Sequence, residues 1–247
     1  MVPTDAQTSL IGKITTALQA DARIGSAWLV GSLGRGNGDA FSDVDVMVVV
    51  ADDAFDAAFK AWSADLSAIA PAVLINVLFG RVLNVVVDDW SRFDLTFMRP
   101  AEFAARAPSW AKPLFNRSGD KPTPPPSAPV DYQAAAQRIL SLTQEFLRVL
   151  GLLPVAMGRE EYVNCQLGVG HLRGMLIDMM IEQNRIAPED RGGALHVNRL
   201  ITPAQRRTLE ALPAVGPSRQ SVLDAHVAYA RLFFPLAREM CAATGAA

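Results

Sequence analysis

The sequence predicts two structural parts: an α/β (α+β) domain with a mixed sheet, followed by an all-α helical bundle. Three observations lead to this prediction. Short β-branched and aromatic runs alternate with helical patterns before residue 115, and long stretches of helical spacing fill the chain after residue 131. Between them lies Lys121-Pro-Thr-Pro-Pro-Pro-Ser-Ala-Pro129. Because such proline density produces an extended, semi-rigid linker, we expect domains at 1–115 and 131–247 and a linker at 116–130.

Helices and strands alternate in the predicted N-terminal domain. We expect a helix over 5–22 with Thr8 or Ser9 as its cap, and a second helix that is capped by Asp52 and Asp53 and ends at Pro71. A short third helix is expected over 102–107, and the expected strands are 24–30, 43–50, 73–79, 82–87 and 93–98. The last two strands are expected to form an antiparallel hairpin, because Asp88-Asp89-Trp90-Ser91 is typical of a turn.

Four helices are predicted in the C-terminal domain. Their expected ranges are 132–150, ending at Gly151 and Pro154, then 160–183, 202–212 and 218–243. Helices of these lengths are sufficient for a small bundle.

The amino-acid composition and the net charge limit the class of protein to which the chain can belong. Half of the 247 residues are apolar, the net charge is −2, and the two cysteines, Cys165 and Cys241, are far apart in sequence. These values indicate a globular cytoplasmic protein without a disulfide framework or a long nucleic-acid footprint. No secretory signal is evident, and no run of about 18 uninterrupted apolar residues predicts a membrane span.

The most informative stretch runs from Leu29 to Val50. Gly31-Ser32 interrupts the first strand, a glycine-rich loop covers 33–42, and the second strand begins with Asp43-Val44-Asp45. Residues i and i+2 of a strand face the same way, so Asp43 and Asp45 share one face. Two carboxylates beside a turn with accessible amides predict a site for hard cations and phosphates.

Asp94 is the best candidate for a third carboxylate. It lies in the middle of an apolar strand, where a carboxylate is unfavourable unless a cation or a donor compensates it. If its strand lies beside the strand of Asp43 and Asp45, the three carboxylates converge and can hold one or two Mg²⁺ ions against a triphosphate. The Gly31-Ser32 turn would then offer N–H groups and a hydroxyl to the phosphates.

These residues resemble a known family. Gly31-Ser32, ten intervening residues and Asp43-Val44-Asp45, with Asp94 in a later strand, are similar to the signature of the DNA-polymerase-β-like nucleotidyltransferases. The size of the chain and its helical second half resemble the bacterial aminoglycoside and lincosamide nucleotidyltransferases. The resemblance implies magnesium-dependent transfer of AMP from ATP to a hydroxyl of a small molecule.

The same resemblance implies roles for individual residues. Asp43 and Asp45 would bind magnesium, and Asp94 would complete the metal site or act as a base. The expected nucleotide-binding residues are Gly31, Ser32, Arg35 and Ser42.

A second group of candidates lies on the predicted helix over 160–183. Asp178 and Glu182 share its polar face and are candidates to hold ammonium groups of a cationic acceptor. An ordinary solvated helix face explains the same pattern.

Several alternatives stay open at this stage. A regulatory or toxin–antitoxin-type enzyme that modifies a protein partner fits the same motif, and so does an inactive nucleotide-binding domain, against which the three carboxylates argue. Trp90, Trp110 and Tyr132 are able to stack on a ring or to pack internally. The two-part organisation leaves room for a homodimer.

Overall fold

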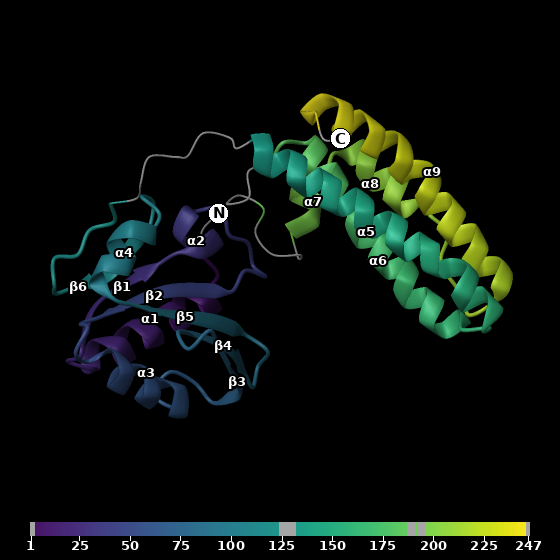
Figure 1. Cartoon of the computed structure of the whole chain (residues 1–247). Coiled ribbons are helices and arrows are strands. Elements are labelled where there is room, and N and C mark those ends of the chain that lie inside the picture. The colour runs from purple at the N-terminus through teal and green to yellow at the C-terminus, as the bar shows by residue number, and fades with distance from the viewer. Residues whose placement is uncertain (1–2, 124–131, 187–190, 192–195, 246–247) are drawn as a thin grey trace. The chain divides into compact units, whose positions relative to one another are not determined.

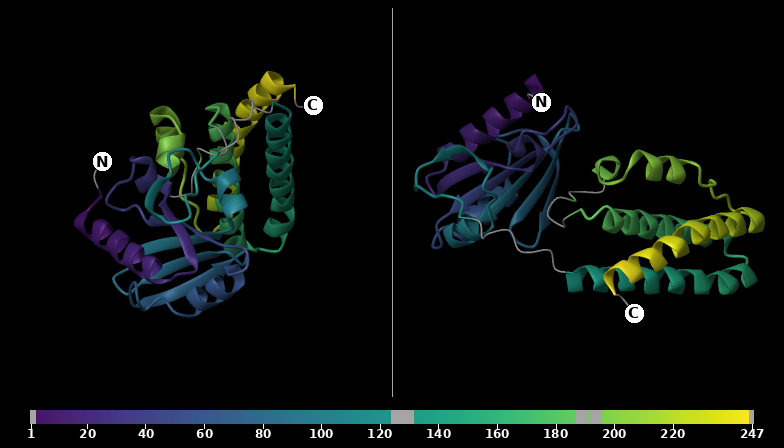
Figure 2. Two further views of the ribbon diagram at one scale, coloured as in Figure 1. Left: turned by 90° about the vertical axis from the view of Figure 1, so that its left-hand side faces the viewer. Right: turned by 90° about the horizontal axis from the view of Figure 1, so that it is seen from above.

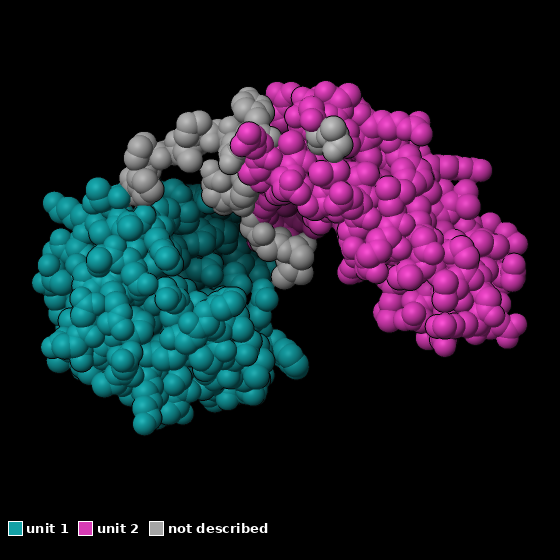
Figure 3. All heavy atoms as spheres, in the orientation of Figure 1, with its two compact units in different colours: residues 1–127 teal, residues 128–247 magenta. Residues whose placement is uncertain are grey.

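The structure is a computed structural model and describes residues 3–123, 132–186, 191 and 196–245. The chain divides into two compact units, residues 1–127 and 128–247, which Figure 3 shows in different colours. Residues 124–131, which include most of the proline-dense segment, lie outside the described residues.

A six-stranded sheet with the order β3-β4-β5-β2-β1-β6 forms the centre of the first unit (Figure 1). The strands are β1 (Ile24–Leu29), β2 (Val44–Val50), β3 (Ala72–Leu78), β4 (Val82–Val87), β5 (Arg92–Met98) and β6 (Lys112–Asn116). Strands β2 and β5 are parallel, and the other neighbours are antiparallel. The prediction of a mixed sheet is therefore confirmed, including the antiparallel pairing of β4 with β5.

Side chains alternate between the two faces of the sheet along each strand, so the burial of each residue shows which face it lies on. Val44, Val46 and Val48 of β2 are buried in the main core, together with the apolar residues of α1 (Asp5–Ala20) and α3 (Phe55–Ala64). The opposite face carries Asp45 and a smaller cluster in which α4 (Pro100–Arg106) packs Phe103 against Trp28. The carboxylates therefore lie on the face away from the main core, as the period-2 pattern predicts.

The ends of two helices differ from the prediction. Helix α1 begins after Thr4, which forms a capping box with Gln7, so Thr8 lies inside the helix and is not its cap. Helix α3 ends at Ala64, well before Pro71. The apolar spacing beyond Ala64 misled the prediction, because Leu66 and Ile69 are buried in the core from the turn that follows the helix.

Two further local predictions are wrong. The residue that caps α3 is Ala54, while Asp52 instead accepts a hydrogen bond from Arg99. Strand β6 was not predicted, although it pairs with β1 along the sheet edge. A strand that begins with Lys112-Pro113 carries no clear period-2 signal of its own, and its pairing depends on the neighbour that tertiary structure provides.

Helices make up the second unit, as predicted (Figure 2). They are α5 (Tyr132–Gly158), α6 (Tyr162–Gln183), α7 (Val197–Leu200), α8 (Pro203–Glu210) and α9 (Arg219–Thr244). The short helix α7 was not among the four predicted helices. Their core includes Phe146 of α5, which stacks on Phe233 of α9 with 3.7 Å between the ring centroids. Thr202 and Ser218 cap α8 and α9, as their positions predict.

Helix α5 continues through Gly151 and Pro154, so the prediction that it ends there is wrong. Burial on both sides of the proline explains the continuation, because Phe146 precedes it in one cluster and Met157 follows it in another. Among the described helices, only the part of α5 from Gln133 to Gly158 is long and apolar enough to cross a membrane, judged by length and composition alone.

Candidate active site

Asp45 and Asp94 lie directly opposite each other on the parallel strands β2 and β5. Both side chains are partly buried on the face away from the main core. The prediction that the strand of Asp94 lies beside the strand of Asp45 is therefore correct. Parallel pairing places two carboxylates one strand spacing apart, about 4.8 Å between the backbones.

Asp43 lies just before β2 and completes a cluster of negative charge. Its only charged partner at short range among the described residues is Arg92, the first residue of β5, whose guanidinium is 3.7 Å from Asp43 Oδ2. Both side chains are partly exposed. A single partly exposed arginine cannot neutralise three carboxylates, so the cluster retains excess negative charge.

The pKa values of the two opposed carboxyls reflect this excess. Burial raises the pKa of Asp45 to about 6, with the charges of Asp43 and Asp94 adding to the shift and Arg92 opposing it. Burial also raises the pKa of Asp94; a hydrogen bond from Asn84 opposes that shift and Asp43 adds to it. A group of perturbed carboxyls on one face is typical of a functional site.

Gly31 brings the backbone after β1 against Asp45. Its φ of +61° is unfavourable for other residues, and a Cβ at this position would lie 1.8 Å from Asp45 Oδ2. The Val30 N–H donates to the Asp45 carbonyl at 2.9 Å. The expected tight turn is in fact the five-residue helix α2 (Gly31–Arg35), which ends at Gly36 in the left-handed conformation.

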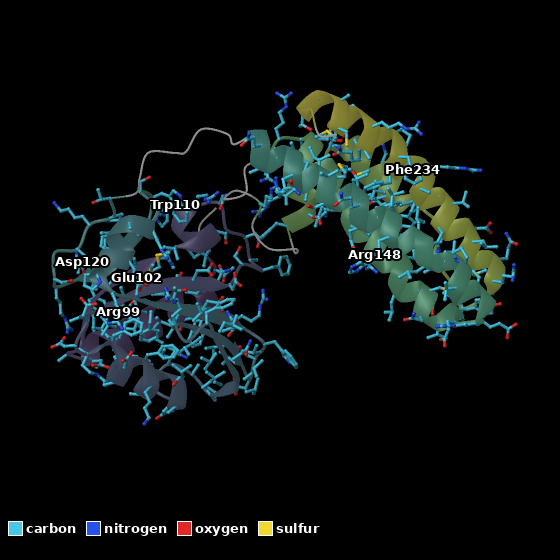
Figure 4. All side chains as sticks on the ribbon, viewed as in Figure 1. Arg99, Glu102, Trp110, Asp120, Arg148 and Phe234 are labelled. Atoms are coloured by element: carbon cyan, nitrogen blue, oxygen red, sulfur yellow. The ribbon has the colours of Figure 1, made fainter. Side chains whose placement is uncertain are left out.

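The other expected nucleotide-binding residues lie near this turn. Ser32 is the second residue of α2 and is partly exposed. The Arg35 guanidinium lies 4.8 Å from the centre of the ring of Trp110, a residue that Figure 4 labels. The Ser42 hydroxyl accepts from the Asp39 N–H and donates to its carboxylate, so it holds the loop before Asp43 together. Contact of these residues with a nucleotide stays a prediction.

Asp178 and Glu182, the candidates in the second unit, have different surroundings. Glu182 is buried and paired with Arg138 at 2.9 Å and Arg191 at 2.7 Å. Burial alone would raise the pKa of Glu182, but the two arginines outweigh it and lower that pKa. Asp178 is exposed one turn earlier on α6. The contacts of Glu182 indicate a structural group of ion pairs that ties Arg138 of α5 and Arg191 to α6.

A pocket of about 620 Å³ opens beside Asp43. Its walls come from α1, from the loop before β2 and from the turn between β4 and β5, and they include Lys13, Phe41, Trp90 and Arg92. Phe41 and Trp90 are both more than four-fifths exposed, so Trp90 is available for stacking and is not packed internally. Of the three carboxylates, only Asp43 lines this pocket, where it lies near the two accessible aromatic rings.

Sequence reasoning missed two residues of the site, Arg92 and Asn84. Arg92 stands two residues before Asp94 and therefore shares its face, which is a signal that the sequence contained. Asn84 interrupts the apolar run of β4 and donates from Nδ2 to Asp94 Oδ2 at 2.7 Å. An asparagine within a β-branched run is uncommon, but its partner could not be known before the pairing of β4 with β5 was known.

Residues 11–89 match the family model of the nucleotidyltransferase domain. Residues 11–89 of the first unit therefore form a nucleotidyltransferase domain, in agreement with the resemblance of the Gly-Ser and Asp-x-Asp motifs to the polymerase-β-like superfamily. The match includes Gly31, Asp43 and Asp45 and ends before Asp94. No curated protein matches the chain by sequence.

Several solved structures resemble the chain at a distance, among them the following three. An aminoglycoside 6-adenyltransferase from Bacillus subtilis is 14% identical with a TM-score of 0.41, over 96% of this chain and 89% of that one. A nucleotidyltransferase-like protein from Exiguobacterium sibiricum is 15% identical with a TM-score of 0.33, over 90% and 73%. The STING-associated CdnE c-di-GMP synthase from Capnocytophaga granulosa is 10% identical with a TM-score of 0.31, over 93% and 82%. Values this low carry no information about the substrate.

Proposed function

We propose that the protein transfers a nucleoside monophosphate, AMP from ATP, to a hydroxyl of a small molecule. The pairing of Asp45 with Asp94 on adjacent parallel strands, with Asp43 beside them and the Gly31 turn against Asp45, is the observation that carries the proposal. Its leading acceptor is an aminoglycoside or a related antibiotic, because the Gly-Ser and Asp-x-Asp motifs and the helical second half resemble the bacterial enzymes that modify such compounds.

The carboxylate cluster fits a divalent cation. Three carboxylates on one sheet face are the hard oxygen donors that Mg²⁺ prefers, and a cation would relieve the repulsion that contributes to the raised pKa of Asp45. Among the described residues, no three His, Cys, Asp or Glu side chains form a ready-made metal site. We therefore expect Asp43 and Asp45 to hold magnesium together with the triphosphate, as is usual for Mg²⁺ sites.

Bound magnesium would neutralise the phosphate oxygens at the reacting centre. The N–H groups in the first turn of a helix have no partner within that helix, and we expect those of α2, together with the Ser32 hydroxyl, to bind the triphosphate tail. Asp94, whose pKa is raised, takes the proton of the acceptor hydroxyl. The acceptor oxygen then bonds to the α-phosphorus, the bond to the bridging oxygen breaks, and pyrophosphate leaves.

Mass spectrometry with kanamycin, streptomycin and lincomycin, ATP and Mg²⁺ tests this proposal. We expect one acceptor to gain the mass of an AMP group, and we expect Asp43→Asn and Asp45→Asn to abolish the gain. Asp56→Asn is the matched control, because Asp56 is exposed on α3, on the side of the main core. Full transfer by Asp45→Asn would exclude the assigned site.

A second candidate function is transfer to a protein partner. Exposed apolar side chains on α5 and α6 favour it, because such patches often mark protein contacts. These side chains are Leu147, Leu152, Val155, Val163 and Leu167. AMP on a co-purified protein, with none on the antibiotics, would select this function and leave the carboxylate site unchanged.

A further inference from the structure

A row of four polar side chains crosses the sheet from β2 to its edge strand β3. The register pairs Asp45 with Asp94, Asp94 with Asn84, and Asn84 with Asn76. The four residues therefore lie side by side across four neighbouring strands, on the face away from the main core. Strands lie about 4.8 Å apart, so the row extends roughly 14 Å from Asp45 to Asn76.

The two asparagines interrupt otherwise apolar strands. Asn84 stands within Val-Leu-Asn-Val-Val-Val and Asn76 within Ala-Val-Leu-Ile-Asn-Val-Leu, although asparagine is unfavourable in strands. The Asn84 amide holds Asp94, which leaves its carbonyl oxygen for another donor. Asn76 is exposed, and its side chain forms no hydrogen bond within the part of the chain that the structure describes. Neither core packing nor local hydrogen bonding accounts for Asn76.

Apolar residues border the asparagines on both sides. Leu74 pairs with Val86 on one side, and Leu78 pairs with Val82 on the other. Neither β3 nor β4 contains a charged residue. An uncharged surface with amides along its middle and apolar borders suits a ring compound with hydroxyl groups, because the amides bind hydroxyls and the borders contact C–H faces. β3 and β4 themselves offer no cationic side chain to a polyanion.

We propose that Asn76 and Asn84, with their apolar borders, form the acceptor subsite for a polyhydroxylated ring compound. The reacting hydroxyl lies at Asp94 and the rest of the acceptor extends over β4 toward β3, while the nucleotide occupies the opposite side, at Gly31 and α2. This inference rests on the proposed function and specifies where the acceptor binds.

Steady-state kinetics with kanamycin and lincomycin as probes, ATP and Mg²⁺ test the subsite. Removal of one hydrogen bond in Asn76→Ala should raise the KM for the accepted probe about five- to tenfold and leave the KM for ATP unchanged. Val77→Ala is the matched control, because Val77 is the next residue of β3, is also exposed and faces the other way. It should change neither constant.

Side-chain NH₂ signals in the ¹⁵N spectrum provide a second measurement on the unreacted complex. Titration with the probe should move the signals of Asn76 and Asn84 and leave that of Asn164, which is on α6, in place. The subsite is overturned if Asn76→Ala transfers AMP with an unaltered KM for the probe and the Asn76 signal of the wild-type protein does not move on titration. The proposed function would still stand in that case.

Failure of the function itself gives a different pattern. Transfer that survives in Asp45→Asn would contradict the proposed site, whatever Asn76 does. If the wild-type protein modifies neither probe and neither probe moves the two signals, the subsite is overturned. If AMP is then found on a co-purified protein, the proposed transfer reaction still holds, but its acceptor is a protein.

Discussion

Gly31 and Asp45 are in such close contact that a methyl group at position 31 would lie 1.8 Å from Asp45 Oδ2. The backbone of the turn therefore forms one wall of the carboxylate cluster. A side chain at this position would push away the carboxylate that lies between Asp43 and Asp94. The glycine thus determines both the course of the chain after β1 and the position of Asp45.

This contact predicts that Gly31→Ala removes activity by displacing Asp45. A displacement of about 1 Å at a reacting centre can lower the rate roughly hundredfold, and we expect a fall in kcat of this order. Gly36→Ala is the control, because Gly36 also has positive φ, at +83°, but the nearest atom to its added methyl would be 3.9 Å away. Both substitutions place alanine at a positive φ, but only Gly31→Ala also clashes with Asp45, and equal activity of the two variants would contradict the prediction.

The charge cluster predicts that Asp45 titrates near pH 6 in magnesium-free buffer. Carboxyl ¹³C shifts should show this value, and Asp43→Asn should lower it because one of the repelling charges is gone. The folded pKa is above the unfolded one, so the folded state binds the extra proton and its stability falls as the pH rises from about 4 to about 6. Titration of Asp45 at its ordinary pKa would show that the cluster is not formed.

Stability of the first unit should depend on Asp21. Its carboxylate accepts hydrogen bonds from Arg23 and from the Trp62 indole at 2.9 Å, and the Arg23 contact chiefly lowers its pKa to about 2. The folded pKa is below the unfolded one, so this contribution is complete above pH 4 and is lost as the pH falls toward 2.

Asp21→Asn should therefore lower the free energy of unfolding by about 1–2 kcal/mol at pH 7, after allowance for solvent screening. The difference from the wild-type protein should shrink as the pH approaches 2, and chemical denaturation at several pH values measures it. Asp65→Asn is the control, because the Asp65 carboxyl is exposed and, among the described residues, accepts a hydrogen bond only from Ser67. A difference that is independent of pH would contradict the assigned cause.

Substitution of Glu182 distinguishes a structural role of this residue from a role in binding the acceptor. Glu182→Gln keeps the shape but removes the charge that faces Arg138 and Arg191, and we expect a loss of about 1–3 kcal/mol in the stability of the second unit. Glu145→Gln, which disrupts the exposed pair with Arg148, should hardly change the melting temperature. A raised acceptor KM with unchanged stability would instead support the ammonium-binding role.

Much of the site could be predicted because its signals are local. The period of two along a strand determines that Asp43 and Asp45 share a face and that Asp94 faces away from Phe93 and Leu95, whatever the strands pair with. The helical spacing of apolar residues in the second half and the helix starts at Thr202 and Ser218 are also signals of the local sequence. Helix ends were predicted less well, since burial of Leu66 and Met157 depends on contacts distant in sequence.

By itself, the sequence determined the kinds of elements, the faces of the strands and the residues capable of carboxylate chemistry. Only the tertiary structure decided that Asp94 lies opposite Asp45, that Asn84 holds Asp94 and that Asn76 continues the row to the sheet edge. It also decided that Glu182 faces two arginines and not the solvent. The physical reason is that side-chain direction along a strand follows from local backbone geometry, whereas register and partners follow from the packing of residues distant in the chain.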